Sequence, residues 1–412
     1  MNSSPRNRLF IMMVLELFIW GAWLPLIWTY MGPDGLNFSA QQQVWIGSAF
    51  AIASVLGIFF SNQFADRNFA AERFMAFSHL VGGAAILGMF FVTSFPAFFT
   101  LMLIHSLFYV PTISVANSLA FANLQNPQKE FGLVRMGGTV GWIMAAWPLW
   151  FILQGKQGVD AAQAAKYIFV VSGIASFVLA AFSLTLPHTP PKKGEPGDSL
   201  AWLKAVKFLA VPSLLVLFIV TFIDATIHNG YFVMAGGFLA KAGFKPENIM
   251  LVMSIGQIAE IVTMIILGTV LAKLGWRMTM IIGILGHAVR FGIFAFFPES
   301  TALLVIVQVL HGICYAFFFA TVYIFIDAAF PKDVRSSAQG LFNLLILGIG
   351  DLAAKWIFVP LQGRYVTGNG LEGYRELFLV PTGMALAAAV LLAVAFRPSD
   401  AIRSGGPSAV PH

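Results

Sequence analysis

Long apolar runs recur along this sequence of 412 residues. A helix needs about 20 apolar residues to cross a lipid bilayer. Runs of this kind cover residues 9–30, 42–62, 74–93, 97–121, 132–153, 166–187, 210–236, 248–272, 279–297, 301–328, 336–360 and 376–396. Only 10% of the residues are charged, whereas an ordinary soluble domain has about 25%. We therefore exclude a soluble globular protein and predict an all-α polytopic membrane protein with 12 transmembrane helices.

One polar segment interrupts this pattern near the middle of the chain. Residues 187–198 form its longest stretch of proline, glycine and charged residues, a composition typical of a linker. Equal numbers of apolar runs precede and follow it. We predict an N-terminal six-helix half at residues 1–187, a linker at 188–208, a C-terminal six-helix half at 209–397 and a tail at 398–412.

The basic residues indicate how the chain is oriented. Most of the 24 Lys and Arg residues fall on the side that carries both termini and the linker, which the positive-inside rule places in the cytoplasm. They are scattered singly, so the net charge of +6 does not indicate a nucleic-acid partner. The single cysteine, Cys314, lies in an apolar run and excludes a disulfide framework or a thiolate metal site. We expect no metal and no cofactor.

Several ionisable residues within the spans are expected to have structural roles. A charge in the bilayer centre is costly, so each needs a partner or a wet cavity. Asp351 and Lys355 are four residues apart on one helix face and can neutralise each other. Arg290 lies in mid-span, where we expect bonds to backbone carbonyls. Asp327 precedes a charged loop, which favours a role at a helix end.

Three other acids are candidates for carrying a proton through the membrane: Glu260, Asp224 and Glu16. Glu16 lies about one turn before Trp20, where it is either a cavity-facing acid or a paired structural one.

Polar clusters on three predicted helices indicate a binding site. Gln257 and Glu260 are three residues apart, and an amide beside a carboxylate can bind the hydroxyls of a polyol or a ribose. The helix at 210–236 carries a polar stripe of Asp224, Thr226, His228 and Asn229. The helix at 132–153 carries Arg135, Thr139 and Trp142, and its Gly137, Gly138 and Gly141 allow another backbone to come close. Alternatively, these polar groups hold neighbouring helices together.

Two six-helix halves joined by a polar linker are typical of the major facilitator superfamily, in which the halves rock around a site near the bilayer midplane. Two loops support this assignment. Residues 64–68 include Asp66 and Arg67, and residues 271–277 include Lys273 and Arg277. Both loops resemble the short acidic and basic loop motif of the superfamily, the second without its acid.

The same segments resemble the bacterial nucleoside:proton symporter family of this superfamily. The resemblance covers most of the chain and is carried by residues 18–24, 109–112, 135–142, 184–188, 254–260 and 335–340. The resemblance implies import of nucleosides by proton symport across the bacterial inner membrane. We expect the protein to act as a monomer.

The resemblance also implies a set of substrate-binding side chains. By matching motif these are Arg135, Thr139, Trp142, Asn229, Gln257 and Glu260. Thr226 and Tyr315 stand at positions aligned with family site residues, and His311, one helical turn before Tyr315, is a further candidate. Among the matched residues, Gln257 and Glu260 would hold the ribose hydroxyls. His311 is also a candidate for proton coupling because imidazole titrates near neutral pH, although a hydrogen-bonded structural role is favoured.

Two positions depart from the family pattern. Thr226 stands where the family has a glutamine, and Ala316 follows Tyr315 where the family has an aspartate that contributes to ligand contact and proton coupling. Either Glu260, Asp224 or Glu16 then carries the proton, or transport is uncoupled. The alternative function is a carrier for another solute, either a sugar or polyol importer or an exporter of amphipathic compounds. A membrane enzyme is excluded because the sequence has no metalloprotease, phosphate-loop or nucleophile-elbow motif.

Overall fold

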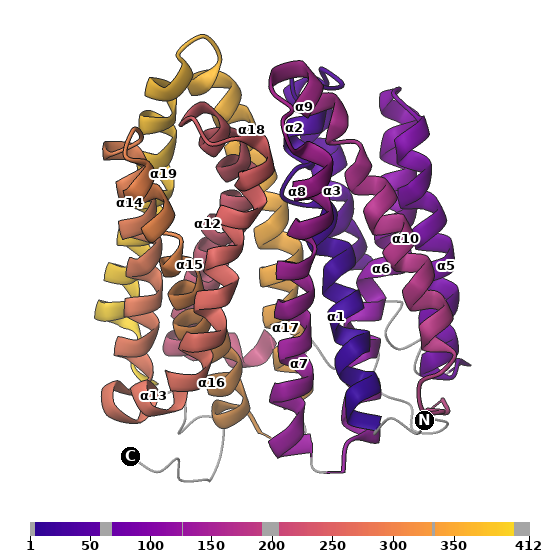
Figure 1. The fold of residues 1–412 in the computed structure, drawn as a ribbon. Helices are drawn as coiled ribbons and strands as arrows, with labels where there is room; N and C mark the ends of the chain where they lie inside the picture. The colour runs from indigo at the N-terminus through magenta and orange to yellow at the C-terminus, as the bar shows by residue number, and fades with distance from the viewer. Residues whose placement is uncertain (1–4, 58–67, 126, 192–205, 332–333, 399–412) are drawn as a thin grey trace. The chain divides into compact units, whose positions relative to one another are not determined.

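The fold is entirely helical in the part of the chain that the structure describes (Figure 1). The structure is a computed structural model that describes residues 5–57, 68–125, 127–191, 206–331 and 334–398. Contacts group the chain into two compact units. Unit 1 contains Met1–Glu195 and Ala235–Ser254, and unit 2 contains Pro196–Met234 and Ile255–His412.

Unit 1 begins at the N-terminus, and its helices follow one another with short connections. They are α1 (Pro5–Trp23), α2 (Ile27–Met31), α3 (Ala40–Leu56), α5 (Ala71–Gly88), η2 (Met89–Phe91), α6 (Phe95–Asn123), α7 (Pro127–Met144), α8 (Ala146–Leu153), α9 (Gly158–Ala164) and α10 (Tyr167–Ser183). Helix α1 packs against α7, and α10 packs against α5. The short helices α2 and α9 contact each other at the end of the unit away from the N-terminus (Figure 1).

Two long helices are divided between the units, with the end of the first and the start of the second belonging to unit 1. These are α12 (Pro212–Lys241), preceded by η3 (Phe208–Ala210), and α13 (Pro246–Phe296). Within unit 1, the Trp150 indole donates a hydrogen bond to Asn248 Oδ1 of α13 at 3.3 Å. The remaining elements are α14 (Thr301–Ile306), α15 (Val309–Cys314), η4 (Tyr315–Ala320), α16 (Thr321–Ala329), α17 (Arg335–Asn343), η5 (Leu344–Ile349), α18 (Gly350–Val366) and α19 (Gly370–Ala395).

The helices are long and apolar enough to confirm the predicted polytopic membrane architecture. Ten helices among the described residues have the length and hydropathy to cross a membrane. One of them, α13, has 51 residues and turns at Gly275, where φ is 70°. At 1.5 Å per residue it measures about 76 Å, enough for two crossings of a hydrocarbon core of about 30 Å. Helix α3 coincides with the predicted run 42–62, of which 58–62 lie outside the described residues.

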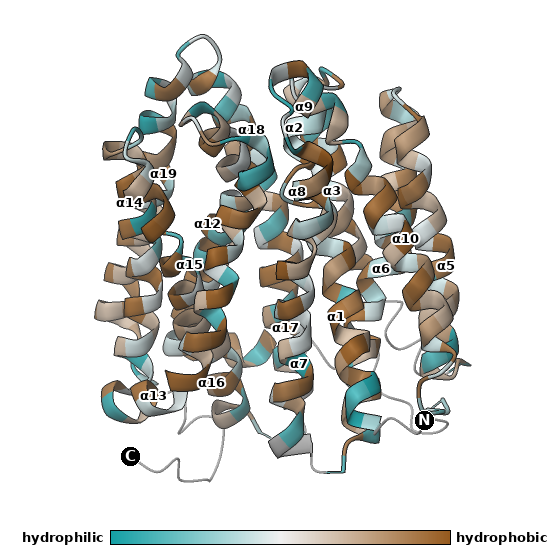
Figure 2. Cartoon of the chain, in the orientation of Figure 1, coloured by the Kyte–Doolittle hydropathy of each residue, from teal (hydrophilic) through white to brown (hydrophobic). Residues whose placement is uncertain are grey.

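Hydropathy follows the same pattern along the ribbon. In Figure 2 hydrophobic residues cover most of the length of α5 and α10, and hydrophilic residues gather at the start of α1 and at the turns. Many apolar side chains of the helices are exposed, including Phe91 of η2, Ile265 of α13 and Val394 of α19. Exposed apolar residues along long helices are expected where the surrounding medium is lipid.

Some predicted spans are interrupted along their length. The run 132–153 divides into α7 and α8 at Ala145, because Pro148 has no N–H to donate to the carbonyl of Met144. The first run divides into α1 and α2, and Pro25 stands in the break. The run 301–328 contains a π-helical turn, η4, and a second π-helical turn, η5, follows α17.

The predicted linker begins with residues that are bound to α5. His188 Nδ1 lies 2.7 Å from Glu72 Oε1, and the Thr189 N–H donates to Glu72 Oε2 at 3.0 Å. The first loop motif, at 64–67, and most of the predicted linker, at 192–205, lie outside the described residues, as do residues 399–412 of the predicted tail. The second loop motif coincides with the turn of α13 at Gly275.

Candidate functional site

Helix α7 carries three of the predicted substrate-binding residues and crosses α1 at very short distance. A Cβ added to Gly137 would lie 2.7 Å from the carbonyl oxygen of Phe10, and one added to Gly141 would overlap the carbonyl oxygen of Val14. The predicted close approach of another backbone to these glycines is confirmed. The crossing places one face of α7 against α1.

Trp142 belongs to an aromatic cluster at this crossing. Its ring centre lies 5.5 Å from that of Trp20 in an edge-on arrangement, and Trp20 stacks on Phe50 at 4.6 Å. Gly21 leaves room for Trp142, because an added Cβ would lie 3.1 Å from its Cα. Arg135 and Thr139, on the same helix, are half-buried. Helix α7 of unit 1 therefore carries a guanidinium, a hydroxyl and an indole that could contact a substrate.

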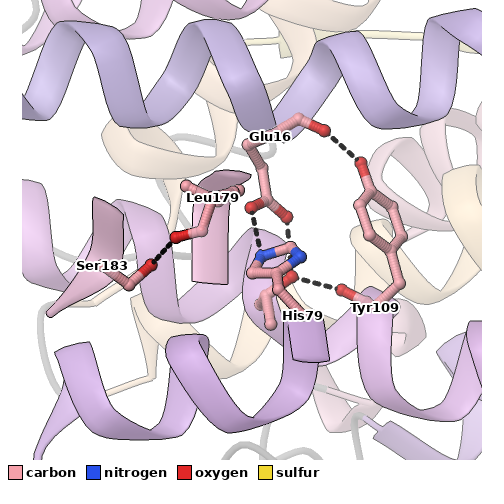
Figure 3. Close-up of polar contacts among 6 residues, drawn as sticks. Glu16, His79, Tyr109, Leu179 and Ser183 are labelled. Atoms are coloured by element: carbon pink, nitrogen blue, oxygen red, sulfur yellow. Dashed lines mark hydrogen bonds and ion pairs between the residues drawn. The ribbon is translucent and has the colours of Figure 1, made fainter. Parts of the chain in front are cut away.

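Glu16, one of the three candidate proton carriers, is fully buried and bonded through both carboxylate oxygens (Figure 3). Its Oε2 lies 2.9 Å from His79 Nε2, and its Oε1 accepts a hydrogen bond from the Thr112 hydroxyl at 2.6 Å. The Tyr109 hydroxyl donates to the Glu16 backbone carbonyl at 2.6 Å. Of the two roles that the sequence leaves open for Glu16, the geometry favours the paired structural acid.

His79, which contacts Glu16 Oε2, was not predicted to be a functional residue. A histidine within an apolar run is a signal that could have identified it, since such residues need partners. Nearby in Figure 3, the Ser183 hydroxyl bonds to the Leu179 carbonyl of its own helix at 2.7 Å.

Helix α12 carries two predicted substrate-binding residues in unit 2. Asn229 Nδ2 donates to the carbonyls of Ala225 at 2.9 Å and Ile346 at 3.1 Å. These two bonds fix the orientation of its amide. The Thr226 hydroxyl bonds to the Phe222 carbonyl of its own helix at 2.8 Å. The only hydroxyl proton of Thr226 is therefore already donated to the backbone of α12.

Helices α13 and α15 bring Gln257, Glu260 and His311 together. A Cβ added to Gly256 would lie 2.8 Å from Cβ of His311, and one added to Gly312 would meet the backbone of Glu260. The two glycines therefore let the helices touch where the predicted residues lie. The Gln257 side chain is 5% exposed, and its Oε1 accepts no hydrogen bond from the described residues. Glu260 is half-buried.

Arg290 connects two buried histidines of unit 2. Its guanidinium donates to His311 Nδ1 at 2.6 Å and to His287 Nδ1 at 3.0 Å. Its carbon lies 4.2 Å from the ring centre of Tyr231, a distance suited to a cation–π contact. The expectation that Arg290 binds backbone carbonyls is wrong, because the carbonyls of a helix are already used within it and two imidazoles offer better acceptors.

Asp224 stands at the end of this network. Its Oδ2 lies 3.7 Å from His287 Nε2, and both residues are fully buried. Neither oxygen of Asp224 accepts a hydrogen bond from the part of the chain that the structure describes. Asp224, His287, Arg290 and His311 are called the arginine–histidine network below.

Tyr315 and Ala316 lie in η4, beside the network. The Tyr315 ring centre is 6.0 Å from that of His228, which in turn stacks on His311 at 4.8 Å. Ala316 is fully buried against Leu267, Phe317 and Ala320. The position at which the family has an acid is therefore packed in apolar surroundings here.

The predicted pair of Asp351 and Lys355 is found, bonded on the same face of α18. Asp327 lies near the end of α16, and its Oδ1 is 3.1 Å from Nη1 of Arg335, a partner that was not predicted.

The predicted site residues thus form two groups. Unit 1 holds those of α7, and unit 2 brings together those of α12, α13, α15 and η4. Buried polar groups on long apolar helices are typical of a multi-pass membrane protein that carries a polar solute.

Comparison with known proteins gives the family. The family described as "Nucleoside H+ symporter" matches residues 3–401, and the chain belongs to it. YegT of Escherichia coli (strain K12), a proposed nucleoside transporter, is 31% identical over 95% of this chain and 94% of its own. The xanthosine permease of the same organism is 27% identical over 95% of both chains.

The fold comparison agrees. A crystal structure of the nucleoside transporter NupG superimposes with a TM-score of 0.85 and 25% identity, covering 96% of this chain and 100% of the other. A D-xylose-proton symporter shares the fold, with a TM-score of 0.74 and 13% identity over 96% of this chain and 95% of the other.

Proposed function

We propose that this protein imports nucleosides across the cytoplasmic membrane together with protons, by alternating access. Membership of the nucleoside H+ symporter family is the observation that carries the proposal. The similarity to the xanthosine permease and to NupG over nearly the whole of each chain supports nucleosides as the cargo.

We propose the substrate contacts residue by residue. In unit 1 Arg135 and Thr139 offer polar groups and Trp142 offers a ring on which a base can stack. In unit 2 Asn229 contacts the base or the sugar, and Gln257 with Glu260 holds the ribose hydroxyls. Thr226, His311 and Tyr315 complete the set. The uncommitted Oε1 of buried Gln257 supports this assignment, because a buried acceptor without a partner is costly.

The proposed membrane orientation follows from the distribution of Lys and Arg residues along the sequence. Both termini and the linker are placed in the cytoplasm, and the protein acts as a monomer in the inner membrane. The proton-binding acid is Glu260, Asp224 or Glu16, because Ala316 cannot carry a proton.

A second candidate is transport of another solute, either import of a sugar or polyol or export of an amphipathic compound. Thr226 and Ala316 favour it, because a shorter side chain and a missing acid both remove polar groups from the family pattern.

Uptake of labelled uridine and adenosine into proteoliposomes tests the proposal. Saturable uptake, stimulated by an inward proton gradient and not competed by ribose or free bases, is the expected result. Vesicles without protein are the control. Absence of nucleoside uptake by folded protein would refute the proposed substrate, and competition by sugars would favour the second candidate.

The Glu260→Gln substitution is expected to weaken nucleoside binding at Glu260. Hydrogen bonds to a charged group contribute about 1.5–3 kcal/mol. The half-saturation concentration should therefore rise about 10- to 150-fold. Concentration-dependent uptake measures it, with Glu247→Gln in the first turn of the same helix as the matched control. An unchanged half-saturation concentration would remove Glu260 from the site.

A further inference from the structure

We propose that Asp224 is the proton-binding residue of this transporter and that the arginine–histidine network transmits its protonation to the substrate residues of α13. The inference rests on the proposed proton symport and selects one of the three candidate acids. Asp224 and the arginine–histidine network all belong to unit 2.

The hydrogen bonds of Arg290 determine the tautomer of two histidines, His287 and His311. A guanidinium only donates hydrogen bonds, so His287 and His311 must each present an Nδ1 lone pair to it. Each imidazole therefore keeps its single proton on Nε2. A second proton could enter either ring only by breaking its bond to Arg290. These histidines connect Arg290 with its surroundings, but neither of them binds the transported proton.

The tautomer of His287 directs its Nε2–H toward Asp224. The two atoms are 3.7 Å apart, too far for a hydrogen bond, and the carboxylate accepts no hydrogen bond from the described residues. A fully buried carboxylate with so little support is costly as an anion and gains from binding a proton. A proton on either oxygen of Asp224 would break no hydrogen bond of the arginine–histidine network, because neither oxygen is bonded to it.

Glu16 differs from Asp224 in its contacts. Both of its carboxylate oxygens are bonded, one to His79 and one to Thr112. These contacts are those of a structural acid, whereas the oxygens of Asp224 have no hydrogen-bond partner among the described residues.

Other titratable or charged groups lie around Asp224, on α12 itself and on the elements that pack with it. They are His228 and Tyr231 of α12, His287 and Arg290 of α13, His311 and Cys314 of α15, Tyr315 of η4, and the Asp351–Lys355 pair of α18, whose Gly350 packs against Ala225. Of these, His228 is the main rival, since its Nδ1 has no partner among the described residues. Its ring stacks at 4.8 Å on His311, which is bonded to Arg290, so a second positive charge there would be repelled.

Protonation of Asp224 changes the charge of the network. The anion balances Arg290 through His287; once Asp224 is neutral, the charge of Arg290 is uncompensated. The other bond of Arg290 is to His311, which lies against Gly256, next to Gln257. Protonation of Asp224 therefore changes the electrostatic potential at Gln257, where we place the ribose hydroxyls. Release of the proton weakens the binding of these hydroxyls.

The Asp224→Asn substitution tests the proposal in proteoliposomes. A one-unit pH gradient stores about 1.4 kcal/mol per proton, which drives about tenfold accumulation of uridine. In the variant this ratio should fall to about 1, and a pH-sensitive dye in the lumen should no longer respond to uridine, while exchange of labelled for unlabelled uridine continues. Asp327→Asn, at a helix end of the same unit, is the matched control and should accumulate uridine as the wild type does.

Accumulation that remains tenfold in Asp224→Asn would overturn the proposal. So would loss of coupling in Glu16→Gln, Glu260→Gln or His228→Gln with coupling retained in Asp224→Asn. Either result leaves nucleoside transport by the wild type standing, so that the inference fails alone.

Infrared difference spectra of the wild type give a second readout that needs neither transport nor a variant. A carboxylic-acid band that appears on acidification should shift when aspartate is labelled with carbon-13 and stay in place when glutamate is labelled. A band that follows glutamate would overturn the proposal. If the aspartate band is present but no nucleoside is transported, the proposed function fails and the assignment of the proton site stands.

Discussion

Replacing Gly141 by alanine is expected to separate α1 from α7 and to lower the thermal stability of the purified transporter. The added Cβ would overlap the carbonyl oxygen of Val14, and a backbone atom cannot rotate away as a side chain can. Overpacking of this kind costs about 1–3 kcal/mol and occasionally more. Unfolding in detergent, followed by intrinsic tryptophan fluorescence, measures the fall in Tm.

The matched control is Gly132→Ala on the same helix. A Cβ at Gly132 meets nothing within 4 Å, and alanine favours a helix by up to about 1 kcal/mol over glycine. Its Tm should stay equal or rise. Equal Tm values for Gly141→Ala and Gly132→Ala would show that the close crossing of α1 and α7 does not stabilise the fold.

Replacing Arg290 by leucine is expected to have a still larger effect. It leaves the Nδ1 atoms of His287 and His311 buried without a donor and removes the cation that balances Asp224. Removing one partner of a buried charged pair costs about 3–5 kcal/mol. A large fall in Tm and loss of uridine uptake should follow, whereas exposed Arg364→Leu should change neither.

A double-mutant cycle separates the loss of the histidine hydrogen bonds from the loss of charge balance at Asp224. If the unbalanced charge of Asp224 contributes, adding Asp224→Asn to Arg290→Leu should recover part of the lost stability, because the stability effects of coupled residues are not additive. Strict additivity of the two Tm changes would indicate that Asp224 and Arg290 do not interact.

Much of the fold follows from local sequence. The apolar runs predict the spans, because a helix in lipid must satisfy its backbone internally and bear apolar side chains. Pairs close in sequence, such as Asp351 and Lys355, were also predictable, since helical geometry places residues four apart on one face. The breaks at Ala145 and after Trp23 were missed, although Pro148 and Pro25 signalled them.

The partners of buried charges were not predictable. Nothing in the local sequence links Glu16 with His79 or Thr112, which are 63 and 96 residues away. Arg290 was expected to bind backbone carbonyls from its place in mid-span. Its bond to His311 was not predictable, because His311 lies on a different helix.

The sequence by itself determined the class of protein, the helices and the candidate polar residues, because the cost of placing polar groups in lipid acts on each residue where it stands in the chain. Only the tertiary structure decided which of those residues are bonded in pairs and which are left without a partner. Glu16 and Asp224 are alike in the sequence, as single acids in apolar helices. They differ because hydrogen bonds depend on atoms that folding brings within about 3 Å, and these atoms lie on other helices.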